Sequence, residues 1–218
     1  MLFRSHLSVA PVRFKGIRHA ASWHASGEIR NSHSDPIEHL MLDEQFNRGL
    51  VVLGQMGLSF DAWCYHSQLD DFVALSRAHP DVTIILDHFA GPLGIGPYTG
   101  KGDEVFVEWR EQVTRLRECV NVYFKLGGIN MKINGHGWHK RAMPASSDEL
   151  VERTAAYYEH CIDTFGAERC MFESNFPVDR ESVSYPVLWN AFKKISAARS
   201  EKEKDQLFRL TAEKVYRL

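Results

Sequence analysis

Five apolar stretches of the chain each end in polar side chains that could take part in catalysis. These side chains are Arg18 and His19, Tyr65 and His66, Asp87 and His88, Lys125, and the run Glu173–Asn175, which leads to Asp179. An imidazole can activate water as a general base or bind a metal ion. An arginine or a lysine can hold a carboxylate or stabilise an oxyanion, and an asparagine can donate a hydrogen bond to developing charge. Such a set suits hydrolysis or another reaction at a carbonyl group.

His66 and His88 are the strongest functional candidates, because each directly follows an apolar strand. His19 follows an alternating strand, so its side chain is expected to point outward. Lys125 fits a substrate-binding role and a half-buried ion pair equally well. Asp87 is expected either on the face opposite to His88 or behind it as a support. A further pair, His136 and His139, lies in a glycine-containing loop that no helix would hold rigid, so it is a weak metal signal.

The elements that must position these groups alternate between strands and helices. Apolar, β-rich runs predict strands at 14–21, 58–65, 82–87, 120–126 and 170–173. Helical spacing of apolar residues predicts helices at 43–56, 69–79, 103–118 and 146–165, and two more that begin near 186 and 200. This order predicts parallel strands covered by helices, with the polar groups at the carboxyl ends of the strands. Five strands suffice for an open doubly wound sheet, whereas a closed barrel needs eight.

Composition excludes several classes of protein. The 218 residues include 26 Lys and Arg against 28 Asp and Glu, a formal charge of -2, which argues against a nucleic-acid or anionic-membrane binder. No apolar run approaches the ~18–20 residues of a membrane span. Four cysteines without a CxxC pair indicate a reducing, cytoplasmic location. Residues 1–27 are basic like a transit peptide, but the alternation over 12–18 favours a strand.

The motifs at the strand ends resemble a known family. They read GIRHAASWH, FDAWCYHSQL, TIILDHFAGPLG, VYFKLGG and RCMFESNFPVD, and they run in family order from about Phe14 to Leu218. They are similar to the amidohydrolase-related family of the amidohydrolase superfamily, in particular to hydrolases like 2-pyrone-4,6-dicarboxylate lactonase and fuconolactonase. The resemblance implies a (β/α)8 TIM barrel that hydrolyses a lactone or a C–N bond, or in some relatives decarboxylates.

The five strands correspond to the last five of the eight in that family. We therefore predict a single α/β domain over residues 1–218, an incomplete TIM barrel of about five βα units, with residues 1–11 outside the resemblance. A chain of this kind is also compatible with a catalytically inactive fragment, because an incomplete barrel leaves strand edges unpaired.

The resemblance also assigns roles to individual residues. His66 falls on the strand that supplies a polar or metal-binding residue, and His88 corresponds to a histidine that contacts substrate or acts in catalysis. Arg18 resembles the substrate-binding arginine of the lactonases. Asn175 stands where the family more often has an aspartate that serves as general base and metal ligand. Since asparagine cannot accept a proton at neutral pH, the base must come from His88, Glu173 or Asp179.

The family's His-x-His pair does not occur in this sequence. We therefore predict no metal site in the chain itself, and expect His66 and His88 to bind a zinc-type ion only if a longer form supplies further ligands. The mechanism predicted is attack of water on a lactone carbonyl. His88, His66 and Asn175 are its catalytic candidates, and Arg18, Lys125 and Asp179 its substrate-binding candidates. The expected partner is a small molecule, with no nucleic acid or membrane, and self-association is left open.

Overall fold

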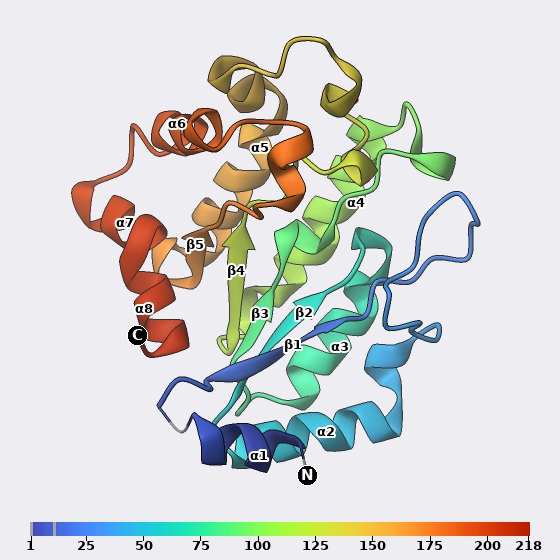
Figure 1. Cartoon of the computed structure of the whole chain (residues 1–218), viewed down its shortest axis with the longest axis vertical. Helices are drawn as coiled ribbons and strands as arrows, with labels where there is room; N and C mark the ends of the chain where they lie inside the picture. Colours follow the sequence, from blue (N-terminus) through green and yellow to red (C-terminus); the bar gives the residue numbers. More distant parts are fainter. Residues whose placement is uncertain (1, 11) are drawn as a thin grey trace.

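The computed structural model describes residues 2–10 and 12–218 and contains one parallel β-sheet (Figure 1). Its five strands pair in chain order, β1 to β5. They are β1 (Gly16–Ala20), β2 (Ser59–Trp63), β3 (Ile84–Leu86), β4 (Val122–Leu126) and β5 (Cys170–Phe172). Within the described residues β1 and β5 each have a single neighbour, so the sheet is curved through only part of a barrel and keeps two edges.

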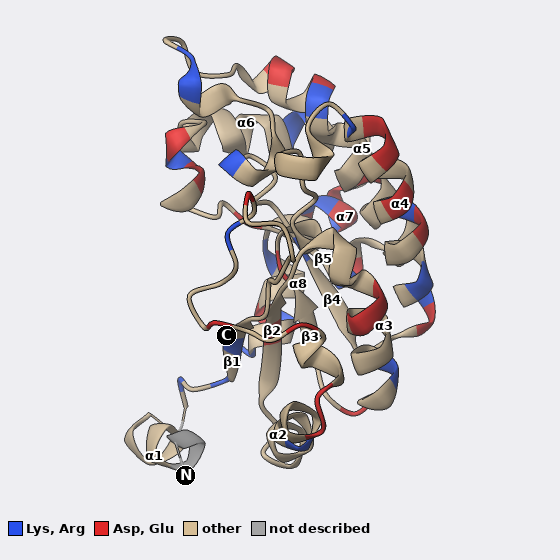
Figure 2. Cartoon of the chain, turned by 90° about the vertical axis from the view of Figure 1, so that its right-hand side faces the viewer, with Lys and Arg blue, Asp and Glu red and all other residues tan. Residues whose placement is uncertain are grey.

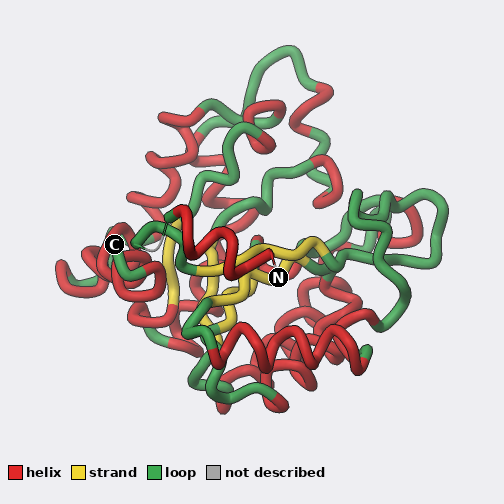
Figure 3. The backbone as a smooth tube through the Cα atoms, turned by 60° about the horizontal axis from the view of Figure 1, so that its bottom comes forward, coloured by secondary structure: helices red, strands yellow, loops and turns green. Residues whose placement is uncertain are grey.

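Helices connect the strands and form the outer layer of the molecule. They are α2 (Glu44–Gln55), α3 (Leu69–Ala78), α4 (Gly102–Thr114), α5 (Ser147–Phe165) and α6 (Tyr185–Ile195). A helix α1 (Leu2–Val9) precedes the sheet, and α7 (Glu201–Asp205) and α8 (Thr211–Tyr216) end the chain. Figure 2 shows charged residues along the outward faces of α3, α4 and α5, and Figure 3 shows the strands surrounded by helices. None of the described helices is long and apolar enough to span a bilayer.

The two faces of the sheet are covered differently. On the outer face, buried side chains such as Phe60, Ile84 and Phe124 pack against the helices in the main hydrophobic core. On the inner face, Ile85 and Met171 pack against Val215 of α8. The C-terminal helix therefore covers part of the inner face of the sheet, and the polar groups lie at the carboxyl ends of the strands.

The predicted elements are confirmed, with small differences at their ends. Ser146 accepts a hydrogen bond from the backbone N–H of Glu149 at the start of α5, and Ser200 and Glu203 form the expected capping box of α7. The helix expected from 200 onward is interrupted by a π-helical turn at Gln206–Leu210. β3 is shorter than its apolar run, which begins two residues earlier at Val82 and ends one residue later at Asp87.

Candidate active site

Charged side chains from all five strands converge on the inner face near the carboxyl end of the sheet. In the register, Arg18 of β1 lies beside Asp61 of β2, and Lys125 of β4 lies beside Met171 of β5. Asp87 and Glu173 directly follow β3 and β5. Because parallel strands in register present alternate residues to the same face, these side chains come within contact distance of one another.

Lys125 lies at the centre of a buried ionic cluster. Its Nζ is 2.6 Å from Asp61 Oδ2 and 3.2 Å from Asp87 Oδ1. Asp87, whose side chain is 0% exposed, also has its Oδ2 2.8 Å from Arg18 Nε. Neither contact of Asp87 has hydrogen-bond geometry, so charge alone compensates this carboxylate. Burial would lower the pKa of Lys125, but the carboxylates of Asp87 and Asp61 outweigh it and raise that pKa, so the ammonium stays charged.

The C-terminal helix reaches this cluster from the other side. The Tyr216 hydroxyl donates a hydrogen bond of 2.7 Å to Asp61 Oδ2, and the Tyr216 ring lies 5.5 Å from Lys125 Nζ. Tyr216 and Asp61 are 155 positions apart in the sequence. α8 is thus part of the site as well as part of the core.

His88 and Glu173 form a hydrogen-bonded pair at the rim. His88 Nδ1 contacts Glu173 Oε1, and an Arg18 guanidinium N–H donates to His88 Nε2 at 3.1 Å. This geometry places a proton on Nδ1 and leaves Nε2 as the acceptor. Burial would lower the pKa of His88, but the charge and hydrogen bond of Glu173 outweigh it and raise that pKa. A carboxylate that orients an imidazole in this way is the arrangement of a general base.

The backbone fixes the position of the imidazole. His88, Phe89 and Ala90 all have positive φ, between 53° and 55°, so the chain turns sharply after Asp87. A Cβ on Gly128 would lie 2.6 Å from His88 Nδ1, which means that only glycine leaves room for the ring there. Strict strand alternation therefore ends at Asp87, and both Asp87 and His88 lie near Arg18. Of the two positions expected for Asp87, the structure has the supporting one.

Asn175 is held by a buried carboxylate. Its amide donates to Asp179 Oδ1 at 2.8 Å, and the amide of Asn130 donates to Asp179 Oδ2 at 3.0 Å. Asp179 is fully buried, and burial raises its pKa to about 6 although both amides act in the opposite direction. Both oxygens of Asp179 are thus engaged within the protein, one by Asn175 and the other by Asn130. A role of Asp179 in substrate binding stays a prediction.

His66 makes none of these contacts. Its Nδ1 accepts the backbone N–H of Leu93 at 3.3 Å, and its ring meets that of Tyr98 edge to face. Burial lowers the pKa of His66 to about 4, so the imidazole is neutral at physiological pH. Its buried Nε2 has no hydrogen-bond partner among the described residues. The structure thus brings Arg18, His88, Lys125, Asn175 and Asp179 to one region and places His66 against the 93–98 segment.

The side chains present do not fit a metal ion. Over residues 2–10 and 12–218, no three histidine, cysteine, aspartate or glutamate side chains are grouped closely enough to hold one. Both ring nitrogens of His88 are already engaged, by Glu173 and Arg18. His66 Nε2 is free, but it is a single donor. No step of the chemistry is therefore assigned to a metal.

Sequence reasoning did not find three participants. Asp61 is a charged residue inside an otherwise apolar strand, and that anomaly is a signal that could have identified it. Trp63, two residues further along β2, places its ring 5.0 Å from that of His88. Tyr216 has no local signal, because its partner is distant in the sequence.

Comparisons with known proteins identify the family of the chain. A family model described as amidohydrolase matches residues 9–218. An uncharacterised protein of Sinorhizobium fredii is 33% identical over all of this chain, and an L-fucono-1,5-lactonase of Burkholderia multivorans is 27% identical over 81% of it. The chain spans 65% of the first protein and 57% of the second.

Solved structures share the fold. An amidohydrolase from Burkholderia multivorans superposes with a TM-score of 0.81 at 22% identity, covering 100% of this chain and 70% of that protein. A second crystal form of this kind, with zinc bound, gives a TM-score of 0.78 at 23% identity, covering 99% and 69%. A putative 2-pyrone-4,6-dicarboxylic acid hydrolase from Pseudomonas putida gives 0.64 at 20% identity, covering 99% and 67%. The five-stranded sheet is thus a partial TIM barrel of the kind these amidohydrolases contain.

Proposed function

Since the chain belongs to the amidohydrolase family, we propose that it hydrolyses a small carboxylate-bearing substrate, opening a lactone or cleaving a C–N bond. The observation that carries this proposal is the His88–Glu173 pair, with the Arg18 guanidinium hydrogen-bonded to Nε2 on the other side of the imidazole. His88 supplies the base, Glu173 the carboxylate that orients it, and Arg18 a cation that can bind an anion. Glu173 and Arg18 both contact the His88 imidazole directly. The fuconolactonase relative and the pyrone-dicarboxylate hydrolase neighbour support a lactone as the substrate class.

In the proposed reaction, the substrate carboxylate pairs with Arg18 and draws the guanidinium away from His88 Nε2. Arg18 can move because its side chain is 49% exposed. The freed Nε2 takes a proton from water, whose oxygen bonds to the carbonyl carbon. Glu173 stabilises the imidazolium that forms, because its carboxylate accepts the hydrogen bond from the Nδ1–H of His88.

Collapse of the tetrahedral intermediate breaks the ring C–O bond. The leaving alkoxide takes the proton from His88, so the water proton ends on the product hydroxyl and the base is regenerated. Asn175 has one amide hydrogen committed to Asp179, and the other is available to the oxyanion. Lys125 is not in contact with the substrate in this scheme; its ammonium favours the ionised form of Asp87, which is ion-paired with Arg18.

A lactone panel tests the proposal, with ring opening followed by acid release. The variant His88→Gln removes the base and is expected to lower kcat/KM about 10²–10⁴-fold. The matched control is His33→Gln, which changes an exposed histidine of the 22–42 connection and should leave the rate unchanged. Hydrolysis at equal rates in the two variants would refute the role of His88. Release of CO2 in place of acid from an aromatic carboxylate would favour decarboxylation, the second chemistry expected from the resemblance.

The two unpaired sheet edges favour one further candidate, a chain that is inactive alone. β1 and β5 each leave one row of backbone groups without a strand partner in the part of the sheet described. Size-exclusion chromatography with thermal melting distinguishes the cases. A single species that melts cooperatively and turns over a lactone supports the working enzyme, and a heterogeneous species without activity supports the inactive fragment.

A further inference from the structure

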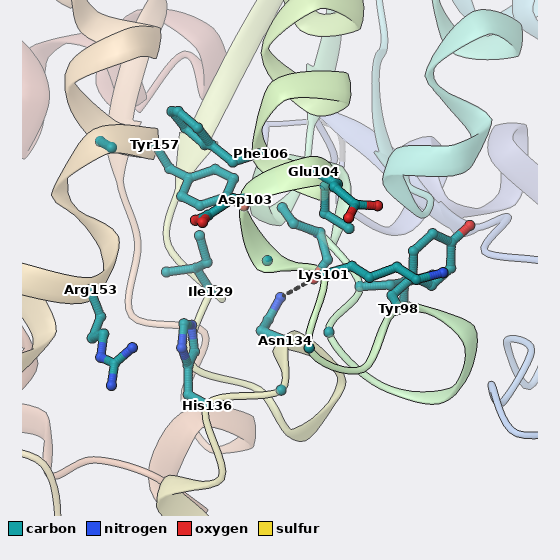
Figure 4. Close-up of a pocket in the computed structure, with 18 of the residues that line it drawn as sticks. Tyr98, Lys101, Asp103, Glu104, Phe106, Ile129, Asn134, His136, Arg153 and Tyr157 are labelled. Carbon is teal, nitrogen blue, oxygen red and sulfur yellow. Dashed lines mark hydrogen bonds between the residues drawn. The ribbon is translucent and has the colours of Figure 1, made fainter.

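A cavity of about 730 Å³ lies outside the Arg18–His88 site. It is bounded by α4, α5 and the loops that follow β3 and β4 (Figure 4). Ile129 forms part of its wall, and the neighbouring Gly128 packs on the other side against the His88 ring. The cavity is therefore separate from the proposed catalytic groups, and none of Arg18, His88, Lys125 and Glu173 lines it.

The floor of the cavity is preformed by two loops that touch through their backbones. Gly94 N–H donates to Ile133 O at 2.7 Å, and a side chain on either Gly94 or Gly135 would collide with the opposite loop. The Asn134 amide adds a hydrogen bond of 2.8 Å to Pro92 O, drawn as the dashed line in Figure 4. The two loops are thus held together by close backbone contact at Gly94 and Gly135. Because this contact is already formed, little rearrangement of the loops is needed for a ligand to bind in the cavity.

One end of the cavity carries the exposed guanidinium of Arg153. Arg153 of α5 and His136 lie near each other there (Figure 4), and Arg153 makes no ion pair with any described residue. Glu149, which lies one helical turn before Arg153 on α5, is engaged by Arg141 and Trp138. Burial, together with the Arg153 charge, lowers the pKa of His136 to about 4, so this imidazole is neutral.

Aromatic rings line the space next to that charge. His136 stacks on Trp138 with ring centroids 4.2 Å apart, and Phe106 meets Tyr157 edge to face at 4.8 Å. Asp103, at the start of α4, also lines the cavity. Burial and, to a smaller extent, the charge of Asp103 raise the pKa of the half-buried Tyr157. A ligand complementary to this lining would have a negatively charged group near Arg153 and away from Asp103. The rest of the ligand would be flat and apolar, to pack against the aromatic rings.

We propose that this cavity is a second binding site, which takes a small aromatic carboxylate. The carboxylate pairs with Arg153, and the ring lies among Trp138, Phe106 and Tyr157. Pairing with a planar carboxylate is the interaction for which guanidinium geometry is best suited. The proposal is independent of hydrolysis at His88, since it uses other residues and needs no turnover.

The test is an NMR titration of the full chain with ¹⁵N-labelled tryptophan indoles. The Trp138 signal, assigned with Trp138→Phe, reports on the cavity because this indole lies in its wall. Benzoate should shift that signal saturably, and uncharged benzamide should bind at least about tenfold more weakly. Arg153→Gln should weaken benzoate binding by about tenfold or more, whereas Asp103→Asn should strengthen it a few-fold by removing a repulsive charge.

Two controls separate this site from general charge effects and from the proposed catalytic site. Lys202→Gln removes one exposed cation on α7 and should leave the benzoate titration of Trp138 unchanged. Arg18→Gln should also leave it unchanged, because Arg18 does not line the cavity. The proposal is overturned if benzoate does not shift Trp138 saturably, or if benzoate and benzamide bind equally. It is also overturned if Arg153→Gln binds benzoate as the parent chain does, or if Lys202→Gln loses as much affinity as Arg153→Gln.

Discussion

Replacing Lys125 with methionine should destabilise the protein strongly, and more so at neutral than at acidic pH. The side chain of Lys125 is 17% exposed and its ammonium compensates Asp61 and Asp87, which are 11% and 0% exposed. Methionine has a similar length but no charge. The variant therefore leaves two buried carboxylates close together, with Tyr216 as the remaining partner of one and Arg18 of the other.

The magnitude follows from the cost of breaking a buried ion pair. Removing one partner typically lowers the free energy of unfolding by about 3–5 kcal/mol, a large part of the stability of a domain. In the parent chain burial already raises the pKa of Asp87, with Lys125 as the strongest opposing charge. Loss of Lys125 raises that pKa further. A carboxyl whose folded-state pKa is raised stabilises the folded state below its unfolded pKa, and this stabilisation is lost as pH rises through the folded value.

The assay is urea unfolding of Lys125→Met and of the parent chain between pH 5 and pH 7.5. The deficit of the variant should shrink as pH falls, because its carboxyl groups take up protons and no longer repel. Adding Asp61→Asn to Lys125→Met should recover part of the loss, whereas adding Asp205→Asn, at an exposed position on α7, should not. A deficit that is constant with pH, or equal recovery by both second changes, would refute this account of the cluster.

Four further outcomes are expected from the site. Tyr216→Phe should lower the free energy of unfolding by about 1–2 kcal/mol, measured by urea unfolding, because it removes the hydroxyl that Asp61 accepts from; no change would mean that α8 does not support the cluster. Gly128→Ala should lower lactone hydrolysis by displacing His88, whereas Gly137→Ala, which has a similar φ of 71° and open space around its Cα, serves as the matched control for backbone strain. Glu173→Gln should shift the rising limb of the pH–rate profile to lower pH, because loss of the carboxylate lowers the pKa of His88 and the neutral base then persists in more acidic solution; an unshifted limb would assign the limb to another group. Dialysis against a chelator should leave the rate unchanged, since the described donor set does not fit a metal, and restoration of a lost rate by zinc would contradict that reading.

Local patterns in the sequence were sufficient to predict the strands, the helices and their caps. Periodicity and capping residues act over a few positions, so Ser200 and Glu203 could be recognised as a helix start without any tertiary information. The order of the elements then requires a parallel sheet, and a parallel sheet brings Arg18, His88 and Lys125 to one end. Even so, the sequence predicted His66 in the same group, whereas its contacts come from the 93–98 segment.

The sequence by itself determined the class of fold, the edge of the sheet that carries the polar groups and the family to which the motifs are similar. The tertiary structure decided which of those groups touch. Positive φ at His88 turns its imidazole toward Glu173, 85 positions later in the chain, and Tyr216 returns across 155 positions to contact Asp61. Such contacts depend on the register of all five strands and on the path of the C-terminal helix. Because these are set by packing over the whole chain, no local pattern encodes them.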